Sequence, residues 1–149
     1  MTSRMLARKI GELMLSRKAH DVTILDLRKL SSAADFFVLC SADSDTQVKA
    51  IADAVRDGME ERGEAPWHSE GFQALSWVVV DFVDVVAHVF HRESRSFYNL
   101  ERLWHDAPRI ELRDEEPSPA QRPAAKARVK KTATARPRTG RKRSASSQE

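Results

Sequence analysis

Apolar residues recur at two spacings along the chain, and these spacings predict alternating helices and strands. A spacing of three to four residues predicts a helix over about residues 3–18, a second that starts behind Ser44 and stops at Gly63, and a third that stops before Pro108. Short apolar or alternating runs predict strands over residues 21–27, 35–41 and 66–73 and within the stretch 77–91. The predicted order is α-β-β-α-β-β-β-α.

This order is typical of one α/β domain with a mixed sheet of about five strands and with helices mainly on one face. We expect that domain over residues 1–113. Residues 114–149 differ sharply, because after an acidic start they hold Pro, Ala, Ser, Thr, Lys and Arg and only one large apolar residue, Val129. Such a segment cannot bury enough apolar surface to offset the entropy of ordering it. A disordered basic tail is therefore predicted there.

The stretch WVVVDFVDVVAHVFH at residues 77–91 is too long for one strand, and its two aspartates indicate a turn. A two-residue turn at Phe82 and Val83 predicts a hairpin that pairs Asp81 with Asp84, Val79 with Val86 and Trp77 with His88. Because side chains alternate along a strand, one face of the hairpin is purely aliphatic and should pack on the helices. The other face mixes large apolar groups with charges and holds Trp77, Val79, Asp81, Asp84, Val86, His88 and Phe90.

This mixed face is the strongest candidate for a functional surface. No amphipathic segment is left over to cover it, so we expect it to be exposed. An apolar centre with an aromatic anchor and a polar rim is typical of a protein-binding patch. The alternative is that the C-terminal helix simply covers Trp77 and Phe90.

Two pairs of carboxylates could instead serve a metal-dependent nucleotidyl or phosphoryl transferase. In the predicted register Asp81 and Asp84 lie about 5 Å apart across the strands, whereas Asp84 and His88 lie about 13 Å apart, too far to share one ion. Asp43 and Asp45 have the spacing of paired carboxylates in nucleotidyltransferases. Each pair also has a structural interpretation, as residues that flank a turn or stabilise the dipole at a helix N-terminus. We expect no enzyme activity, no cofactor and no metal.

Composition narrows the class of protein further. The single cysteine, Cys40, excludes an internal disulfide and a cysteine-built zinc site. No apolar stretch reaches eighteen residues, so we expect a cytoplasmic protein without a membrane span. The net charge of +3 is unevenly distributed: residues 1–116 hold 15 Lys and Arg against 21 Asp and Glu, and residues 117–149 hold 10 against one. The body is thus −6 and the tail +9. A basic tail has two interpretations: it binds phosphates, as in nucleic acid, or it only keeps the chain in solution.

Several pieces of the sequence, in order and spacing, resemble the ribosomal silencing factor family, also called the Iojap-like family. The pieces are ADFFVLCS at 34–41, SDTQVKAIAD at 44–53, EG at 70–71, WVVVDFVDVVAHVFH at 77–91 and ESRSFYNLERLW at 93–104. The resemblance covers about residues 4–107 and leaves the basic tail outside it.

The resemblance implies a nucleotidyltransferase-like fold that is not known for catalysis. It implies a translational repressor that binds the large ribosomal subunit through its protein number fourteen, blocks joining of the small subunit when nutrients are short, and can be a homodimer when free. A basic tail could add a contact to ribosomal RNA. The family motif falls on Trp77, Asp81, Asp84 and His88, with further matches at Glu70, Gly71, Glu93, Tyr98, Glu101 and Trp104.

One position departs from the family pattern. The residue before the second aspartate is usually glycine, and here it is Val83. A two-residue turn that needs positive φ would be strained by a β-branched residue. The valine therefore favours a wider turn, in which Asp81 and Asp84 need not pair.

Overall fold

The computed structural model describes residues 1–113. Its elements, in chain order, are α1 Ser3–Leu15, β1 His20–Asp26, β2 Phe36–Ala42, α2 Asp45–Glu60, β3 His68–Glu70, β4 Trp77–Asp81, β5 Val85–His91, α3 Arg92–Tyr98, α4 Leu100–Leu103 and β6 Arg109–Leu112. None of the helices within this described part is long and apolar enough to cross a membrane. The predicted tail, residues 114–149, lies outside the described residues.

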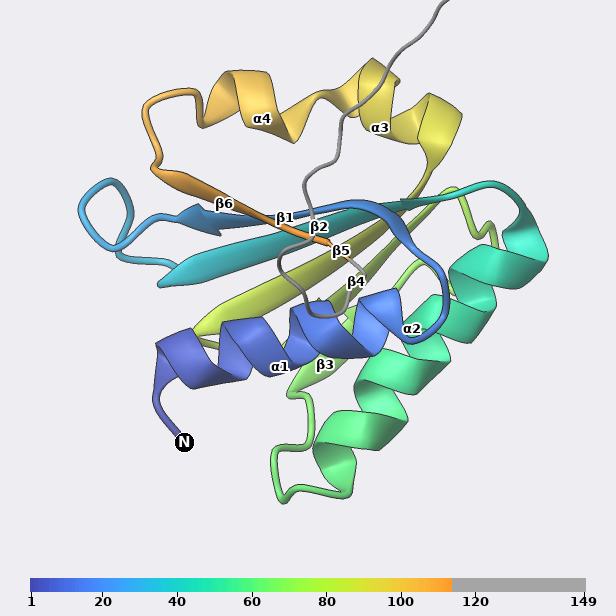
Figure 1. Ribbon diagram of the computed structural model, residues 1–149, viewed down its shortest axis with the longest axis horizontal. Helices are drawn as coiled ribbons and strands as arrows, with labels where there is room; N and C mark the ends of the chain where they lie inside the picture. Colours follow the sequence, from blue (N-terminus) through green and yellow to red (C-terminus); the bar gives the residue numbers. More distant parts are fainter. Residues whose placement is uncertain (114–149) are drawn as a thin grey trace, which may run out of the picture. The chain divides into compact units, whose positions relative to one another are not determined.

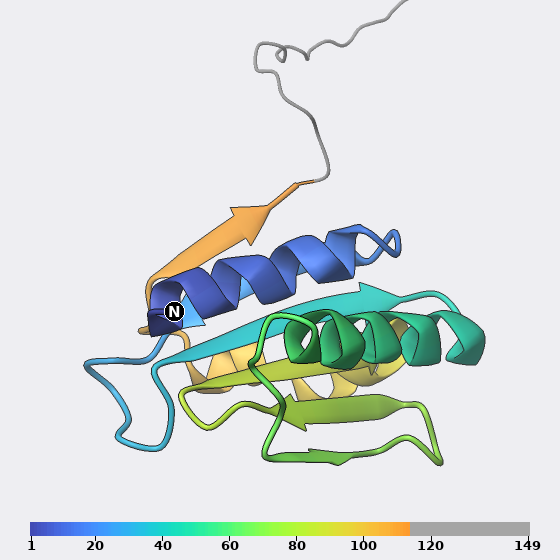
Figure 2. The ribbon, with the colours of Figure 1, turned by 90° about the horizontal axis from the view of Figure 1, so that it is seen from below.

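The six strands form one mixed sheet in the order β3-β4-β5-β2-β1-β6. Its central pair, β2 and β5, runs parallel, and every other neighbouring pair is antiparallel. Both central strands are buried almost along their whole length, as expected for strands covered on two faces. Figure 2 shows the short strand β6 beside α1, at the opposite edge of the sheet from β3.

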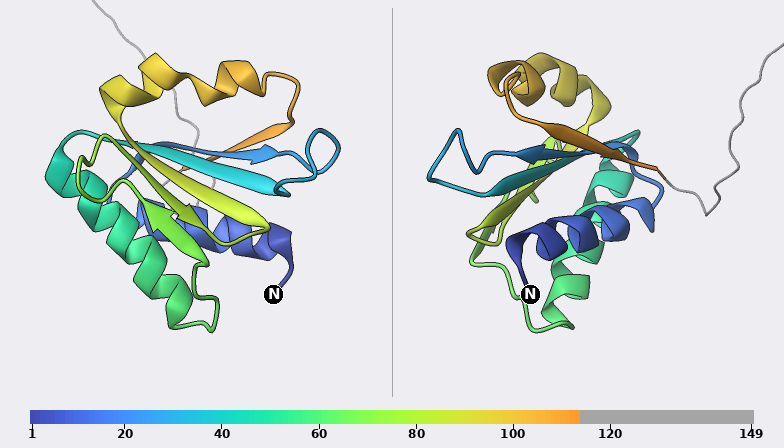
Figure 3. Two further views of the ribbon diagram at one scale, coloured as in Figure 1. Left: turned by 180° about the vertical axis from the view of Figure 1, so that it is seen from behind. Right: turned by 60° about the vertical axis from the view of Figure 1, so that its left-hand side comes forward.

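Helices cover both faces of the sheet, unequally. The long helices α1 and α2 lie together on one face, and the short helices α3 and α4 lie on the other (Figures 1 and 3). The larger core cluster sits under α1 and α2, where Ile10, Val48, Ile51 and Val55 meet the aliphatic side chains of the sheet. Val78, Val80, Val85, Ala87 and Val89 all belong to it. The prediction that one face of the hairpin is aliphatic and packs on the helices is therefore confirmed.

Helix α2 begins behind Ser44 as predicted and ends three residues before the predicted stop at Gly63. Ser44 is its N-cap, and the Ser44 Oγ accepts a hydrogen bond of 3.1 Å from the backbone N–H of Gln47. The Gln47 side chain in turn accepts a bond of 2.8 Å from the backbone N–H of Asp43, so two backbone donors at the helix start are satisfied. The helix ends at Glu60, and Gly63 then turns the chain away with a φ of 81°.

The α/β class and the mixed sheet are confirmed, and two features of the C-terminal part were not predicted. Strand β6 adds a sixth strand that pairs antiparallel with β1. The single C-terminal helix expected before Pro108 is two short helices, because Asn99 takes a left-handed conformation with a φ of 50° and interrupts it. The interruption changes which side chains of this segment face the sheet.

The hairpin is displaced by two residues from the predicted register. Trp77 faces Phe90, Val79 faces His88, and Asp81 faces Val86. The prediction that paired Asp81 with Asp84 was therefore wrong. Because a shift of two residues preserves the alternation of side chains, every residue of β4 and β5 remains on its predicted face, whereas Asp84 lies in the turn between them.

Val83 and Asp84, not Phe82 and Val83, form the centre of this turn. The backbone N–H of Phe82 donates to the carbonyl of Val85 at 2.9 Å, and the N–H of Asp84 donates to the carbonyl of Phe82 at 3.0 Å. Val83 has a φ of 75°, a conformation that is costly for a β-branched residue. The Asp81 carboxylate compensates in part, since it accepts a bond of 2.7 Å from the Val83 N–H.

We expect Val83→Gly to raise the free energy of unfolding by about 1 kcal/mol, because glycine relieves the left-handed strain and the exposed Val83 side chain contributes little packing. Gly63→Val is the reciprocal control. It places the same side chain at a φ of 81° with no atom within 4 Å of its Cβ, and should lower the free energy by about 1–2 kcal/mol. Urea denaturation measures both. A destabilised Val83→Gly would contradict the strain argument.

Candidate partner-binding surface

The sheet face under α3 and α4 holds the side chains predicted to form a binding surface. Trp77, Val79 and Val86 are half-buried there, whereas His88 is only 6% exposed and Phe90 is fully buried. Leu100 and Trp104, from α4 and the residue after it, pack with Phe90 and Trp77 over Leu25, Leu27 and Leu39. The expectation that nothing covers this face was wrong, because the interrupted C-terminal helix covers its centre. Val79, Asp81 and Val86 stay accessible beside it.

Trp77 and His88 form a side-chain pair within this face. The Trp77 Nε1–H donates a hydrogen bond of 3.1 Å to the His88 Nδ1. Since an indole nitrogen can only donate, the His88 ring must accept at Nδ1, and its neutral form carries the proton at Nε2. That Nε2 is buried without a hydrogen-bond partner in the described part of the chain. Burial lowers the pKa of His88 to about 3, so the ring is neutral at physiological pH.

Aromatic rings continue from this pair to the molecular surface. The Trp77 ring lies 5.1 Å from Phe90 below it and 4.6 Å from Tyr98 of α3 above it, centroid to centroid. Tyr98 meets Phe97 edge to face at 5.1 Å. Tyr98 is 48% exposed and Phe97 81% exposed. We define the aromatic surface as Trp77, Val79, Val86, Phe97 and Tyr98.

Acidic side chains border the aromatic surface on the side of β3. Glu70 lies opposite Val79, and His68 lies opposite Asp81, so all four share this sheet face. The His68 ring contacts the Glu70 carboxylate. Gly71, with a φ of 96°, then lets the chain pass so close to β4 that an added Cβ would lie 2.1 Å from the Trp77 carbonyl oxygen. The edge is therefore shaped by the Glu70–Gly71 pair that the family motif contains.

Neither carboxylate pair is assembled as a metal site. Asp81 binds the turn at Val83, and the Asp84 backbone carbonyl accepts from the N–H groups of Asp35 and Phe36. Asp43 lies 2.8 Å from the His20 ring and 3.4 Å from the Arg92 guanidinium, while Asp45 lies in the first turn of α2. Residues 1–113 contain no group of three His, Cys, Asp or Glu that could hold an ion. Asp81 therefore stabilises a turn and Asp45 lies at a helix start, as the structural interpretation of the two pairs predicts.

Two residues of this region were missed by reasoning from the sequence. The helical spacing of Phe97, Leu100, Leu103 and Trp104 predicts one apolar stripe, yet Phe97 is exposed because Asn99 interrupts that helix. Arg95 stands in the polar run ESRS, and arginine is mostly exposed in proteins, yet here it is 9% exposed. No local signal distinguishes a buried arginine, since its partners come from three other segments of the chain.

Comparisons with known proteins agree with the family resemblance. A family model described as "Ribosomal silencing factor during starvation" matches residues 1–137. Ribosomal silencing factor RsfS of Bacillus subtilis is 47% identical over 96 residues, which are 64% of this chain and 81% of that protein. The chloroplastic protein Iojap of Zea mays is 38% identical over 95 residues, 64% of this chain and 41% of that protein. A crystal structure of a Chromobacterium violaceum protein superposes with a TM-score of 0.69 at 32% identity, over 84% of this chain and 98% of that one.

The burial of His88 predicts a pH dependence of stability. Its pKa of about 3 lies below the ordinary value of 6.5, so the unfolded chain binds the proton more tightly than the folded one. The stabilisation is complete above pH 6.5 and is lost as the pH falls toward 3. We expect the melting temperature of the unsubstituted chain to fall more steeply from pH 7 to pH 4 than that of His88→Phe, which cannot titrate at this position. Parallel melting curves for the two proteins would contradict the burial of a neutral ring.

Proposed function

The chain belongs to the ribosomal silencing factor family, and from this membership we propose that it represses translation by binding the large ribosomal subunit and sterically blocking the joining of the small subunit. Repression under nutrient limitation is part of the proposal, as is a cytoplasmic location. Steric blocking requires only that the protein binds the large subunit and occupies space that the small subunit needs, so it requires no catalytic residues. The single observation that carries it is the exposed aromatic surface in a chain of this family.

The composition of the aromatic surface supports a protein partner. Phe97 is 81% exposed and adjoins the half-exposed ring of Tyr98, and contiguous apolar groups that face solvent mark sites of protein–protein contact. Tyr and Trp are also the residues that most often dominate the binding energy of an interface. Trp77, half-buried and held by His88 and Phe90, gives the surface a rigid base.

Charge supports a basic partner. Glu70 and Asp81 border the surface, and residues 1–116 carry a net charge of −6. Opposite potentials accelerate encounter and fix the orientation of two proteins. Proteins of the ribosome are generally basic. Within the large subunit we assign the contact to its protein number fourteen, as the family resemblance implies, and we expect Glu70, Asp81 and Asp84 to take part in it.

The transferase alternative gains no support from the described residues. It requires Asp81 with Asp84, or Asp43 with Asp45, to converge on one ion. Asp81 lies opposite Val86 instead, and Asp43 is paired with His20. The proposal that free copies form a homodimer rests on the family resemblance alone and stays a prediction.

We expect Phe97→Ser to weaken binding to purified large ribosomal subunits by about 10-fold or more, because it removes an exposed aromatic group from the centre of the proposed contact. Met5→Ser is the control. Met5 is 57% exposed on α1, which covers the opposite face of the sheet (Figure 1), so its loss should leave binding unchanged. Co-sedimentation with large subunits, small subunits and joined ribosomes measures both. Equal binding by all three proteins would contradict the assignment of the aromatic surface.

The basic tail is proposed to contact ribosomal RNA in addition. Residues 117–149 carry ten Lys and Arg. Each phosphate contact that they make should add about 0.7–0.9 to the slope of log affinity against log salt. A chain that ends at residue 116 should therefore show a shallower dependence of log affinity on log salt. Phe97→Ser should still weaken its binding to large subunits. An unchanged slope would remove RNA from the proposal, and complete loss of binding would move the main contact to the tail.

A further inference from the structure

The helices that carry the exposed aromatic residues are too short to be stable by themselves. Helix α3 has seven residues and α4 has four, and Asn99 separates them in a left-handed conformation. Isolated helices shorter than about 12 residues are marginal in water. Contacts with the sheet must therefore hold this segment and set the direction in which Phe97 points.

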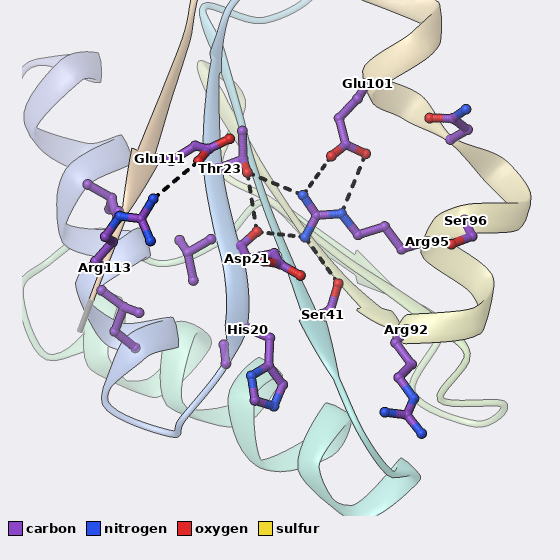
Figure 4. A pocket seen from close by; sticks show the side chains of 15 residues that line it. His20, Asp21, Thr23, Ser41, Arg92, Arg95, Ser96, Glu101, Glu111 and Arg113 are labelled. Carbon is purple, nitrogen blue, oxygen red and sulfur yellow. Dashed lines mark hydrogen bonds and ion pairs between the residues drawn. The ribbon is translucent and has the colours of Figure 1, made fainter. Parts of the chain in front are cut away.

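Arg95 makes the most extensive polar contact between this segment and the sheet (Figure 4). Its Nη1 donates to the Asp21 carbonyl at 2.6 Å and to the Ser41 hydroxyl at 3.1 Å. Its Nη2 donates to the Thr23 hydroxyl at 3.2 Å. These acceptors belong to β1 and β2, so one side chain fastens α3 to two strands. Asp21 lies at an irregularity of β1 and has a φ of 52°, and its carbonyl is held in place by the same guanidinium.

Glu101 completes the contact from α4. Its two carboxylate oxygens accept from the Arg95 Nη2 at 2.7 Å and from the Nε at 3.4 Å. All five N–H groups of the guanidinium then have an acceptor. Partial burial would raise the pKa of Glu101, but the hydrogen bonds and charge of Arg95 outweigh it and hold that pKa below its ordinary value. The pair is therefore ionised at neutral pH, and it connects α4 to α3 across Asn99.

The direction of Arg95 determines where Phe97 lies. Successive residues of a helix are about 100° apart, so residue 97 points about 200° from residue 95 and residue 98 about 60° from it. With Arg95 directed into the sheet, Phe97 must point to solvent and Tyr98 must lie beside the sheet, over Trp77. Both positions are observed, since Phe97 is 81% exposed and the Tyr98 ring is 4.6 Å from that of Trp77.

We propose that Arg95 and Glu101 are positioning residues for partner binding, which set the rotation of α3 on the sheet and thereby present Phe97 and Tyr98 to the large ribosomal subunit. The role rests on the proposed function, because it concerns the same aromatic surface. Neither residue needs to touch the partner. Loss of the pair frees α3 to rotate and to fold Phe97 back against the sheet, which reduces affinity without unfolding the domain.

The test uses the full chain with Glu101→Gln, which keeps the shape of the side chain and removes its charge. Arg95→Lys is a second variant, because lysine keeps the charge but has only three donors. Asp26→Asn is the matched control. Asp26 forms the same two-point contact with Arg28, at 2.7 and 2.9 Å, but between two residues of one short stretch of chain, so it does not link α3 or α4 to the sheet. We expect both variants of the pair to bind large subunits about 10-fold more weakly, and Asp26→Asn to bind normally.

Two further readouts distinguish positioning from general support of the fold. Amide hydrogen exchange should accelerate over residues 92–104 in Glu101→Gln while β2 and β5 stay protected. In the double variant with Phe97→Ser the loss of affinity should be smaller than the two single losses multiplied together, because the pair acts in part through that ring. If the pair only supported the fold, Glu101→Gln would weaken binding by the same factor with and without Phe97→Ser.

Each result has one meaning. Normal binding by Glu101→Gln, additive effects in the double variant, or unchanged exchange over residues 92–104 would overturn the positioning role and leave the proposed function standing. Failure of the unsubstituted chain to bind large subunits would overturn the proposed function, and the role of the pair in binding with it.

Discussion

The parallel pairing of β2 with β5 is the constraint on which the other contacts of this domain depend. It joins Phe36–Ala42 to Val85–His91 residue by residue, so two segments about fifty residues apart form the centre of the sheet. A parallel pair needs a crossover, and α2 supplies it on the face that α1 also covers. The same pairing brings the end of β5 beside Ser41, and it thereby places Arg95 within reach of β1 and β2.

The two faces of the sheet are buried by different means. Aliphatic side chains and two long helices bury most of one face. The other face receives only two short helices, which cover Phe90 and His88 and leave Val79 and Val86 partly accessible. A surface that is half covered can keep aromatic groups ordered and still offer them to a partner. The shortness of α3 and α4 is therefore a condition of the proposed binding.

Two polar side chains are buried on this second face, and each is accommodated in its own way. His88 is neutral, and it accepts one hydrogen bond from Trp77. Arg95 is a buried guanidinium, and Glu101 and three neutral acceptors satisfy all its donors. A buried arginine without such partners would cost several kcal/mol. The first arrangement holds the base of the aromatic surface, and the second holds the helix above it.

The sequence by itself determined the local elements and the side of the sheet to which each hairpin residue points. Alternation has a period of two, so Trp77 and His88 kept their predicted face although the register was displaced by two residues. The family motif likewise contains Glu70, Gly71 and Tyr98, which lie beside β4 and over Trp77. Only the tertiary structure decided that α3 and α4 cover this face, that β6 joins the sheet, and which residues Arg95 contacts. These depend on which distant segments meet, and no spacing within one segment encodes that choice: β6 has four residues of which three are exposed, and the acceptors of Arg95 lie up to 74 residues away.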